Sequence, residues 1–367
     1  MSSELNQLLK PLRDKIDALD HQILDLLNQR AKAAIEVGKV KHGFDAGDAV
    51  IKPEREAQVI RALQKDNLNG VFPNSSVQAV WTEIISACRG LERGLTIAYL
   101  GPKGSFSEQA AYEFYGHAVQ ALACPSFDEV FRAVEAGQAD VGMVPVENST
   151  EGAVNRTQDL LLSTTLKVHG ERTLTIRQCL MTQSGDMQGI EKIMAHPHSL
   201  AQCHQWLSLN YPNMTLEPAA SNSDAARIAA EDPTVAAIAG SHAAAAWELS
   251  MVAENIQDDA NNKTRFLAIG YVINQPSGDD QTSLIVAVPN RVGAVHDLLT
   301  PFSTHGVSMS RFESRPARTG QWEYYFYIDI LGHQHDDNVR QALKDLESQS
   351  SFLKILGSYP RQNDTLL

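Results

Sequence analysis

A heptad pattern of apolar residues, interrupted by one cation, is the feature that most constrains the N-terminal part of this chain. Along residues 16–40, two adjacent rows hold Ile, Leu, Val or Ala, except at Arg30. A repeat of this kind is typical of a long helix that packs along its apolar rows on other helices. We expect it to span about residues 5–41, a length of about 55 Å. Because a compact helical domain does not hold so long a helix, the pattern favours a dimer in which long helices of two copies lie together.

Arg30 stands in the middle of this apolar face, where an unpaired charge is costly. Lys41 returns to within about 20° of the same face, about 16 Å further along the helix. Arg13 borders the stripe about 25 Å in the other direction, so it reaches a shared ligand only from an antiparallel partner chain. These cations predict a pocket for a small polyanion between two subunits. A second interpretation stays open, in which Arg30 only fixes the register of helix packing.

Two further helices complete the N-terminal region. Pro53 suits the first turn of the second helix, on which Arg55 and Glu56 can line the same pocket. A turn then precedes the third helix, for which Ser75 or Ser76 is the expected N-cap.

The composition limits the classes of function. The formal net charge is −13 and no block of basic residues occurs, which disfavours nucleic acid as a partner. The four cysteines form no CxxC pair and have no zinc-site spacing to histidine, so we expect free thiols and no metal site. The N-terminus lacks the apolar segment of a signal peptide, and no apolar run is long enough to span a membrane. These features predict a cytoplasmic protein.

The sequence changes character at Gly94 and again after the polar linker NQPSGDD. In between, strand-like and helix-like segments alternate, which predicts an α/β domain with a mostly parallel sheet, long enough for two lobes, over residues 94–275. Within it, ERTLTIRQCLMT alternates like one strand. Residues 280–367 follow the order βαββαβ of an α+β ferredoxin-like domain. With an all-α region over residues 1–93, the chain is predicted to have three domains.

Four polar loops stand out in the α/β region, namely GPKGSFSEQ, VPVENSTEG, AHPHSLAQ and NKTRF. Taken singly, each is ordinary turn and cap chemistry. The first loop opens a helix whose backbone N–H groups can hold an anion, but it matches neither the phosphate-loop nor the dinucleotide fingerprint.

The segment LRDKIDALDHQILDLLNQRAKAAIEVGKVK, followed by PERE, resembles the all-helical chorismate mutases. The resemblance implies that Arg30 and Arg13 of the partner subunit bind the two carboxylates of chorismate. It also implies that Lys41 hydrogen-bonds the ether oxygen and that Glu56 holds the ring hydroxyl. The implied reaction is an intramolecular rearrangement to prephenate, which needs no nucleophile and no proton transfer.

Three positions depart from the pattern of these mutases. Many members have a glutamine where Glu92 aligns, and an ionised carboxylate cannot donate the hydrogen bond that glutamine gives to the ether oxygen. We therefore hypothesise that Glu92 acts as the neutral acid, a form that burial favours, so that mutase activity falls toward alkaline pH. Cys88 replaces a serine, and Lys52 replaces an aspartate found near the substrate in some members.

In this order, the four polar loops resemble those of prephenate dehydratase. The resemblance implies two α/β lobes, similar to periplasmic binding proteins, with the active site in the cleft between them. It implies that Thr264 is the key catalytic residue and acts on the departing hydroxyl of prephenate, while Arg265 binds a carboxylate or braces the site. The other cleft residues that it implies are Ser105, Glu147, Asn148, Ser149 and Gln202. We expect His196 and His198 to shape their loop rather than act as acids.

The segments VGAVHDLL and SRFESRP resemble the ACT domains attached to prephenate dehydratases. There the two segments form a phenylalanine pocket across a dimer interface, which implies feedback inhibition by L-phenylalanine. The matching positions are Gly293, Ala294, Val295, Glu313, Ser314, Arg315 and Pro316. His296 stands where an apolar residue is more usual. A purely structural dimerisation module is the alternative.

Together, the resemblances imply a bifunctional chorismate mutase–prephenate dehydratase, dimeric or tetrameric, that needs no metal or redox cofactor. Two enzymatic alternatives stay open: a dehydratase whose helical region is only a dimerisation arm, and an arogenate dehydratase. A non-enzymatic, amino-acid-sensing binding protein is the third, and the intact NKTRF loop speaks against it.

Overall fold

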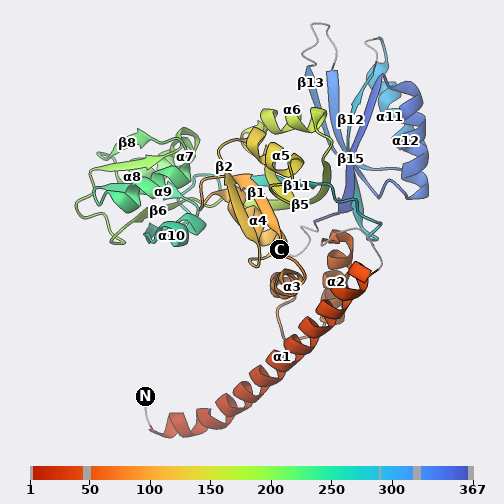
Figure 1. Cartoon of the computed structure of the whole chain (residues 1–367). Coiled ribbons are helices and arrows are strands. Elements are labelled where there is room, and N and C mark those ends of the chain that lie inside the picture. The colour runs from red at the N-terminus through yellow and green to blue at the C-terminus, as the bar shows by residue number, and fades with distance from the viewer. Residues whose placement is uncertain (1–2, 44–50, 289–290, 317–323, 363–367) are drawn as a thin grey trace.

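The computed structural model describes residues 3–43, 51–288, 291–316 and 324–362 of the chain. Its N-terminal part consists of three helices: α1 (Ser3–Gly43), α2 (Pro53–Asp66) and α3 (Asn74–Gly90). The C-terminal end of α1 lies beside α2 and α3, whereas its N-terminal half extends away from the rest of the molecule (Figure 1). The predicted long first helix is confirmed.

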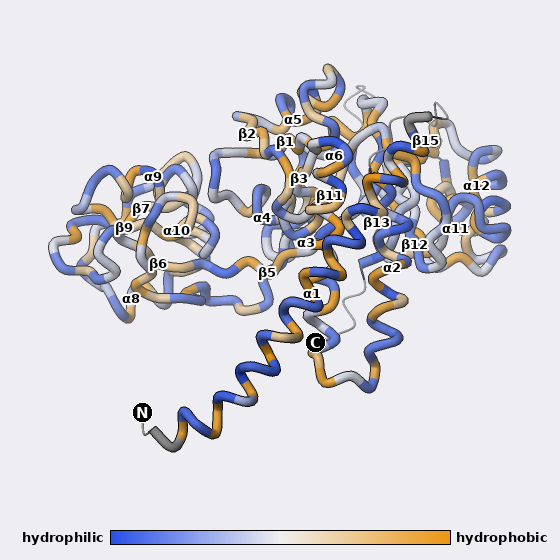
Figure 2. Tube along the Cα trace, turned by 60° about the horizontal axis from the view of Figure 1, so that its bottom comes forward, coloured by the Kyte–Doolittle hydropathy of each residue, from blue (hydrophilic) through white to orange (hydrophobic). Residues whose placement is uncertain are grey.

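The apolar rows of α1 are uncovered in the single chain, and Figure 2 shows hydrophobic residues recurring along its projecting part. Ile16, Leu19, Ile23 and Leu26 each expose between 46% and 62% of their surface. A long exposed apolar row of this kind marks an interaction surface.

The start of α3 differs from the prediction. The N-cap position is held by Pro73, and the helix begins at Asn74, before Ser75 and Ser76. Pro73 has a fixed φ of −59° and an extended ψ, and its carbonyl accepts a hydrogen bond from the amide of Ser76. The proline ring therefore sets the start of this helix, and no side-chain cap is needed.

The first lobe of the α/β region is a mixed sheet in the order β2-β1-β3-β11-β5, with β4 paired to β3. Its strands are β1 (Thr96–Leu100), β2 (Gln120–Cys124), β3 (Val141–Asn148), β4 (Gly152–Ala153), β5 (Lys167–Thr175) and β11 (Lys263–Gly270). The helices are α4 (Phe106–Tyr115), α5 (Phe127–Glu135) and α6 (Asn155–Ser163).

The second lobe is a sheet in the order β10-β6-β9-β7-β8. Its strands are β6 (Cys179–Thr182), β7 (Lys192–Ala195), β8 (Thr215–Pro218), β9 (Val235–Ala239) and β10 (Ser250–Ala253). The helices are α7 (Pro197–Gln202), α8 (His204–Asn210), α9 (Asn222–Glu231) and α10 (Ser241–Trp247).

Two predictions for this region were wrong. The sheets are mixed rather than mostly parallel, because β11 and β6 each run antiparallel to both neighbours. The segment ERTLTIRQCLMT is not one strand but parts of β5 and β6, which belong to different lobes. Both differences have one cause: the chain crosses from the first lobe to the second between β5 and β6, and it returns into β11.

The C-terminal domain has the predicted βαββαβ order. Its elements are β12 (Asp280–Ala287), α11 (Ala294–Thr304), β13 (Met309–Pro316), β14 (Tyr324–Leu331), α12 (Asp337–Gln349) and β15 (Phe352–Pro360). The sheet is antiparallel in the order β13-β14-β12-β15. Its helices cover one face of the sheet, and Leu284 and Val286 of β12 pack beneath them.

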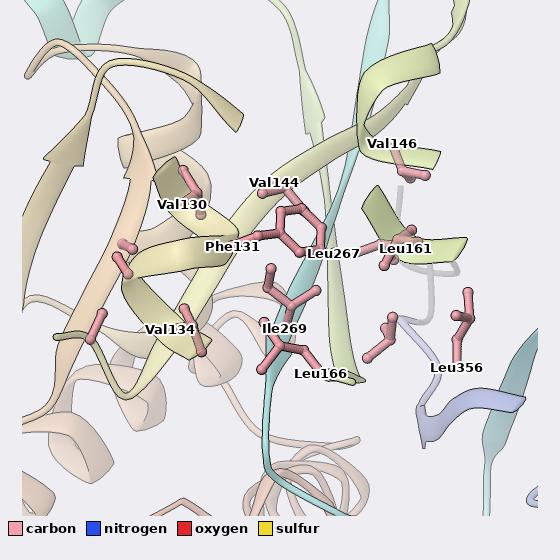
Figure 3. Packing of buried hydrophobic residues seen from close by; sticks show 14 of the residues in the cluster. Val130, Phe131, Val134, Val144, Val146, Leu161, Leu166, Leu267, Ile269 and Leu356 are labelled. Atoms are coloured by element: carbon pink, nitrogen blue, oxygen red, sulfur yellow. The ribbon is translucent and has the colours of Figure 1, made fainter. Parts of the chain in front are cut away.

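The other face of this sheet packs on the first lobe of the α/β region. Ile285 and Leu356 share one core cluster with Phe131, Val144 and Leu267, part of which Figure 3 shows. β15 also approaches β5 so closely that a Cβ atom on Gly357 would lie 2.0 Å from the carbonyl oxygen of Val168. The C-terminal domain is therefore built onto the lobe through a common core.

No helix among the described residues is apolar over a stretch long enough to cross a membrane.

Candidate active sites

The first cluster of predicted site residues lies where the C-terminal end of α1 meets α3. Lys41 Nζ is 3.5 Å from Glu92 Oε2. A Cβ atom on Gly38 would lie 3.1 Å from Glu92 Cγ, so a glycine at this turn of α1 lets the glutamate lie against the helix. The two groups expected on the ether oxygen of chorismate are therefore neighbours.

Glu56 of α2 is held by an arginine that the sequence analysis did not identify. Arg89 Nη1 lies 3.4 Å from Glu56 Oε1. Burial raises the pKa of Glu56, and the charges of Arg89 and, to a lesser extent, Arg30 counteract part of that rise. Arg89 Nη2 also donates a 2.9 Å hydrogen bond to the carbonyl of Tyr115 at the end of α4. Arg89 thus ties this cluster to the first α/β lobe.

The half-buried Arg30 forms no hydrogen bond or ion pair with any of the residues that the structure describes. Cys88 is buried in α3, whereas Arg55 is exposed. Arg13 is also exposed and stands 28 residues before Lys41 on the same helix, a separation of about 42 Å along its axis. The single chain therefore brings Lys41 to Glu92 and Arg30 near Glu56, whereas Arg55 and Arg13 face solvent.

The second cluster centres on Thr264, which is buried at the start of β11 and paired in register with Asn148 of β3. Asn148 Nδ2 donates a 2.8 Å hydrogen bond to Thr264 Oγ1. The orientation of the Asn148 side-chain amide is fixed by its oxygen, because Asn148 Oδ1 accepts hydrogen bonds from the backbone amides of Thr150 and Glu151. Since Thr264 Oγ1 is the acceptor in this contact, its own proton is left to donate elsewhere.

Three other predicted cleft residues form hydrogen bonds within or between the lobes. Ser149 connects the two loops through hydrogen bonds of its backbone amide and its hydroxyl with the backbone of Lys263. Gln202, from α7 of the second lobe, donates to Glu151 of the first lobe over 3.5 Å. Ser105 is the N-cap of α4, and its hydroxyl also donates to the carbonyl of Leu100.

The two histidines of the AHPHSLAQ loop have different surroundings. His196 is the N-cap of α7 and accepts from the amide of His198, and burial lowers the pKa of its ring. His198 Nδ1 lies 3.5 Å from Glu151 Oε2, so this loop also contacts the first lobe.

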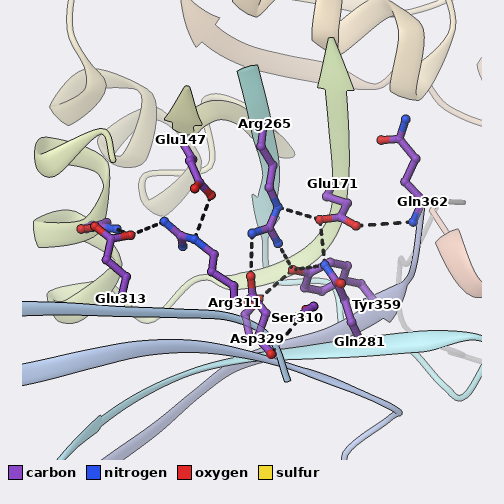
Figure 4. A network of polar contacts seen from close by, with 12 residues as sticks. Glu147, Glu171, Arg265, Gln281, Ser310, Arg311, Glu313, Asp329, Tyr359 and Gln362 are labelled. Atoms are coloured by element: carbon purple, nitrogen blue, oxygen red, sulfur yellow. Dashed lines mark hydrogen bonds and ion pairs between the residues drawn. The ribbon is translucent and has the colours of Figure 1, made fainter. Parts of the chain in front are cut away.

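The Arg265 side chain points into the interface with the C-terminal sheet, toward Asp329 and Tyr359 (Figure 4). Its Nε lies 2.8 Å from Glu171 Oε2, its Nη1 lies 2.5 Å from Asp329 Oδ2, and its Nη2 donates to the hydroxyl of Tyr359. All three guanidinium nitrogens have protein partners. Of the two roles expected for Arg265, this position fits bracing and not the binding of a substrate carboxylate.

The predicted effector residues form two groups in the C-terminal domain. One group lies at the start of α11, and the other lies near the end of β13, the edge strand of the sheet. Gly293 has a φ of +82° and caps α11, which Ala294 begins. Val295 and Ser314 are exposed and thus accessible to a second copy. Glu313 and Arg315 instead contact α6: Glu313 accepts from Gln158, and Arg315 Nη1 lies 3.0 Å from Asp159 Oδ1.

Among the residues that the sequence analysis missed are two arginines, Arg89 and Arg311, that form ion pairs with predicted site residues. Arg311 of β13 lies with its Nε 2.8 Å from Glu147 Oε2. Each arginine has one partner in its own domain and one in another domain. In the sequence, each of the two arginines stands close to a predicted site residue: Arg89 follows Cys88, and Arg311 lies two residues before Glu313. This proximity was the one indication that they belong to the sites.

Comparisons with known proteins agree with this arrangement. Family models match residues 12–93 as chorismate mutase type II, residues 97–273 as prephenate dehydratase and residues 282–348 as an ACT domain. A bifunctional chorismate mutase/prephenate dehydratase of Neisseria gonorrhoeae is 48% identical over 98% of this chain and 99% of that protein. The fold and the two clusters define a class of enzyme that joins a helical mutase and a two-lobed dehydratase to an ACT domain. The chain belongs to the family of bifunctional chorismate mutase/prephenate dehydratases.

Solved structures match the part of the chain that follows the helices. A prephenate dehydratase from Arthrobacter aurescens in complex with L-Phe has a TM-score of 0.68 and 34% identity, over 74% of this chain and 92% of its own. A structure described as a novel type of quorum quenching acylase has a TM-score of 0.67 and 27% identity, over 73% of this chain and 98% of its own. Since one fold is found with both descriptions, the reaction has to be argued from the side chains.

Proposed function

We propose that this chain converts chorismate to phenylpyruvate in two steps, at two separate sites, and that L-phenylalanine inhibits it through the ACT domain. The helical region rearranges chorismate to prephenate. The cleft of the two-lobed domain then removes carbon dioxide and water from prephenate. The hydrogen bond from Asn148 to Thr264 is the single observation that carries the second step.

In the mutase site, Arg30 and Arg13 of the partner subunit hold the two carboxylates of the substrate. Arg30 supports this role because it is half-buried and has no described protein partner. Lys41 stabilises the negative charge that grows on the ether oxygen, and Glu56 accepts the hydrogen bond of the ring hydroxyl. The protein selects the compact conformer and preorganises charge around it, which is sufficient for an intramolecular rearrangement.

Glu92 contributes as a neutral acid once the substrate is bound. In the structure its carboxyl group faces the Lys41 ammonium, with 3.5 Å between Glu92 Oε2 and Lys41 Nζ. When Lys41 turns to the ether oxygen, the glutamate has to donate rather than accept, and donation requires a proton. Mutase activity should then fall toward alkaline pH. Glu92→Gln should abolish this fall, and an unchanged pH profile in the variant would exclude the role.

In the dehydratase site, Thr264 donates a hydrogen bond to the departing hydroxyl of prephenate. Asn148 supports this assignment. Its side-chain amide donates to Thr264 Oγ1, so the threonine hydroxyl accepts in this contact and its proton remains free to be donated into the cleft. A threonine hydroxyl is too weakly acidic to be an effective general acid by itself, so it donates or relays a proton. Loss of the ring carboxylate as carbon dioxide supplies the electron pair that expels the hydroxide and makes the ring aromatic. Poor solvation of that carboxylate in the closed cleft favours its departure.

Thr264→Ala tests the second step. The variant should consume chorismate at the wild-type rate but accumulate prephenate, with dehydratase kcat lower by about 10²–10³-fold, whereas Thr264→Ser should retain most activity. Thr215→Ala, at an exposed position of β8, serves as the control for the same chemical change. A Thr264→Ala variant with full dehydratase activity contradicts the assignment.

Running the dehydratase assay on the wild-type protein with arogenate in place of prephenate decides between the two substrates.

The proposed enzyme works in the cytoplasm as a homodimer or a larger homo-oligomer. The uncovered apolar rows of α1 and the position of Arg13 support this assembly, since both require a second copy.

A further inference from the structure

The edge strand β13 directs three charged side chains at alternate positions toward the dehydratase domain. Arg311, Glu313 and Arg315 are each half-buried, while the residues between them are exposed. Arg315 and Glu313 contact α6, through Asp159 and Gln158 respectively. Arg311 instead reaches the end of β3, the strand that carries the dehydratase residues.

Arg311 shares its guanidinium between two carboxylates. Its Nε lies 2.8 Å from Glu147 Oε2, and its Nη2 forms an ion pair with Glu313 (Figure 4). The Arg311 side chain is 13% exposed, against 41% for Glu147 and 26% for Glu313. One largely buried cation thus lies between two carboxylates, one from each domain, and its Nε hydrogen is not aligned for a hydrogen bond with Glu147. The contact with Glu147 is therefore purely electrostatic, so it depends on the charge around Arg311.

Glu147 is directly connected to the dehydratase site. It precedes Asn148 on β3, and these two residues pair in register with Arg265 and Thr264 on β11. A displacement of Glu147 therefore moves the backbone that carries Asn148, whose amide orients the Thr264 hydroxyl. A misplacement of about 1 Å near reacting groups can cost about 100-fold in rate.

An amino-acid effector would add a second cation to this cluster. The Glu313 side chain is 26% exposed, so the ammonium group of an amino acid can reach its carboxylate. Bound there, the ammonium would compete with the Arg311 guanidinium, because two cations on one carboxylate repel each other. Arg311 then loses the contact that fixes its position between the domains.

We propose that Arg311 is a positioning residue of the dehydratase: it holds Glu147 in place from the ACT domain and loses this hold when an amino acid's ammonium group binds Glu313. This inference rests on the proposed function, in which Glu313 belongs to the phenylalanine site. It gives the inhibition a physical mechanism: the effector binds the Glu313 carboxylate that positions Arg311, and Arg311 is then no longer held against Glu147. Such competition is reciprocal, so bound prephenate also weakens the binding of phenylalanine.

The test compares Arg311→Gln, Arg311→Lys and wild type as full-length chains. In Arg311→Gln, dehydratase kcat/KM should fall about 10–100-fold without effector. Phenylalanine should still bind, as measured by calorimetry, but should inhibit the remaining activity by less than about twofold. Arg311→Lys keeps the charge and should recover most of both the activity and the inhibition. Mutase activity on chorismate should remain at the wild-type level in both variants.

Arg340→Gln provides the matched control, because Arg340 lies on α12 of the same domain and pairs only locally, with Asp337. It should behave as wild type in every assay. Wild-type activity of Arg311→Gln, or inhibition by the same factor as in wild type, overturns the proposal. Loss of phenylalanine binding also overturns it, because Arg311 would then be a ligand of the effector. A wild-type chain that does not convert prephenate would instead refute the proposed function.

Discussion

At the scale of single residues, two arginines connect the domains of this enzyme to carboxylates of its proposed active sites. Arg89 lies between Glu56 of the proposed mutase site and the Tyr115 carbonyl of the first lobe. Arg311 lies between Glu147 of the proposed dehydratase site and Glu313 of the ACT domain. The two arginines are largely buried, with 5% and 13% of their side-chain surface exposed, so removing either leaves its carboxylate partner without the cation that compensates its charge. Both positions should therefore affect catalysis without contacting substrate.

For Arg89 the expected effect is a change in pH dependence. Burial raises the pKa of Glu56 and Arg89 counteracts that rise, so Arg89→Met should raise the pKa further. More of Glu56 is then protonated at acidic pH and cannot accept the ring hydroxyl's hydrogen bond. The acidic limb of the mutase kcat/KM profile should move to higher pH, with activity on that limb lower by about tenfold.

The control for Arg89 is Arg93→Met, at an exposed arginine that pairs with Asp140. It should leave the mutase pH profile in place, and Arg89→Lys should largely restore it. An acidic limb of Arg89→Met that coincides with that of the wild type would mean that Arg89 has only a structural role.

At the scale of helices and strands, α1 carries both an exposed apolar surface and part of the proposed mutase site. If two copies pair through this helix, Arg13 and Arg30 of one functional site belong to different chains. Arg13→Ala and Arg30→Ala should therefore each abolish mutase activity alone. When the two variants are mixed and allowed to exchange subunits, heterodimers should regain one intact site, or about a quarter of the wild-type activity if exchange is random.

Subunit exchange in this mixing experiment is checked by tagging one of the variants. Dehydratase activity of both variants should be unaffected, which confirms that they are folded. Mixtures that exchange subunits but stay inactive as mutases would show that Arg13 does not act across the interface.

Sequence patterns predicted the elements well where they depend on local chemistry. The heptad of α1 and the βαββαβ order of the ACT domain are set by periodicity within each segment, and both were predicted. The division of ERTLTIRQCLMT between β5 and β6 depends on where the chain leaves one lobe for the other, and strand alternation does not record this. Arg89 and Arg311 were missed for a related reason. A charged residue on a helix or an edge strand is expected to face solvent, and its burial here comes from a different domain.

At the scale of the whole molecule, a polar junction joins the three parts of the chain. The Tyr115 carbonyl accepts from Arg89 of the helical region, and the Tyr115 hydroxyl lies 2.7 Å from His169 Nε2 on β5. The His169 carbonyl accepts from Asn274, which also donates to the carbonyl of Ser358 in the ACT domain. Stability at this junction should therefore be shared among the domains.

His169 makes that stability dependent on pH. It is fully buried, and burial lowers its pKa to about 3. The unfolded chain binds a proton at this histidine below about pH 6.5, whereas the folded chain does not until about pH 3. The free energy of unfolding should thus be insensitive to His169 above pH 6.5 and fall through this window on acidification, by up to about 1.4 kcal/mol per pH unit.

His169→Gln keeps a hydrogen-bonding group at this position but does not titrate. Denaturant unfolding of the variant and the wild type at several pH values between 4 and 8 measures the difference, and carboxylates common to both proteins cancel. The wild type should lose more stability than the variant on acidification below pH 6.5. Parallel curves would show that His169 is protonated in the folded protein as easily as in the unfolded one.

The most direct measurement on the whole molecule is a time course with chorismate as the only substrate. The purified chain should consume chorismate, pass through prephenate and form phenylpyruvate, and added L-phenylalanine should slow the appearance of phenylpyruvate. Chorismate that stays unchanged, or prephenate that accumulates without any phenylpyruvate in the wild-type protein, would contradict a two-site enzyme.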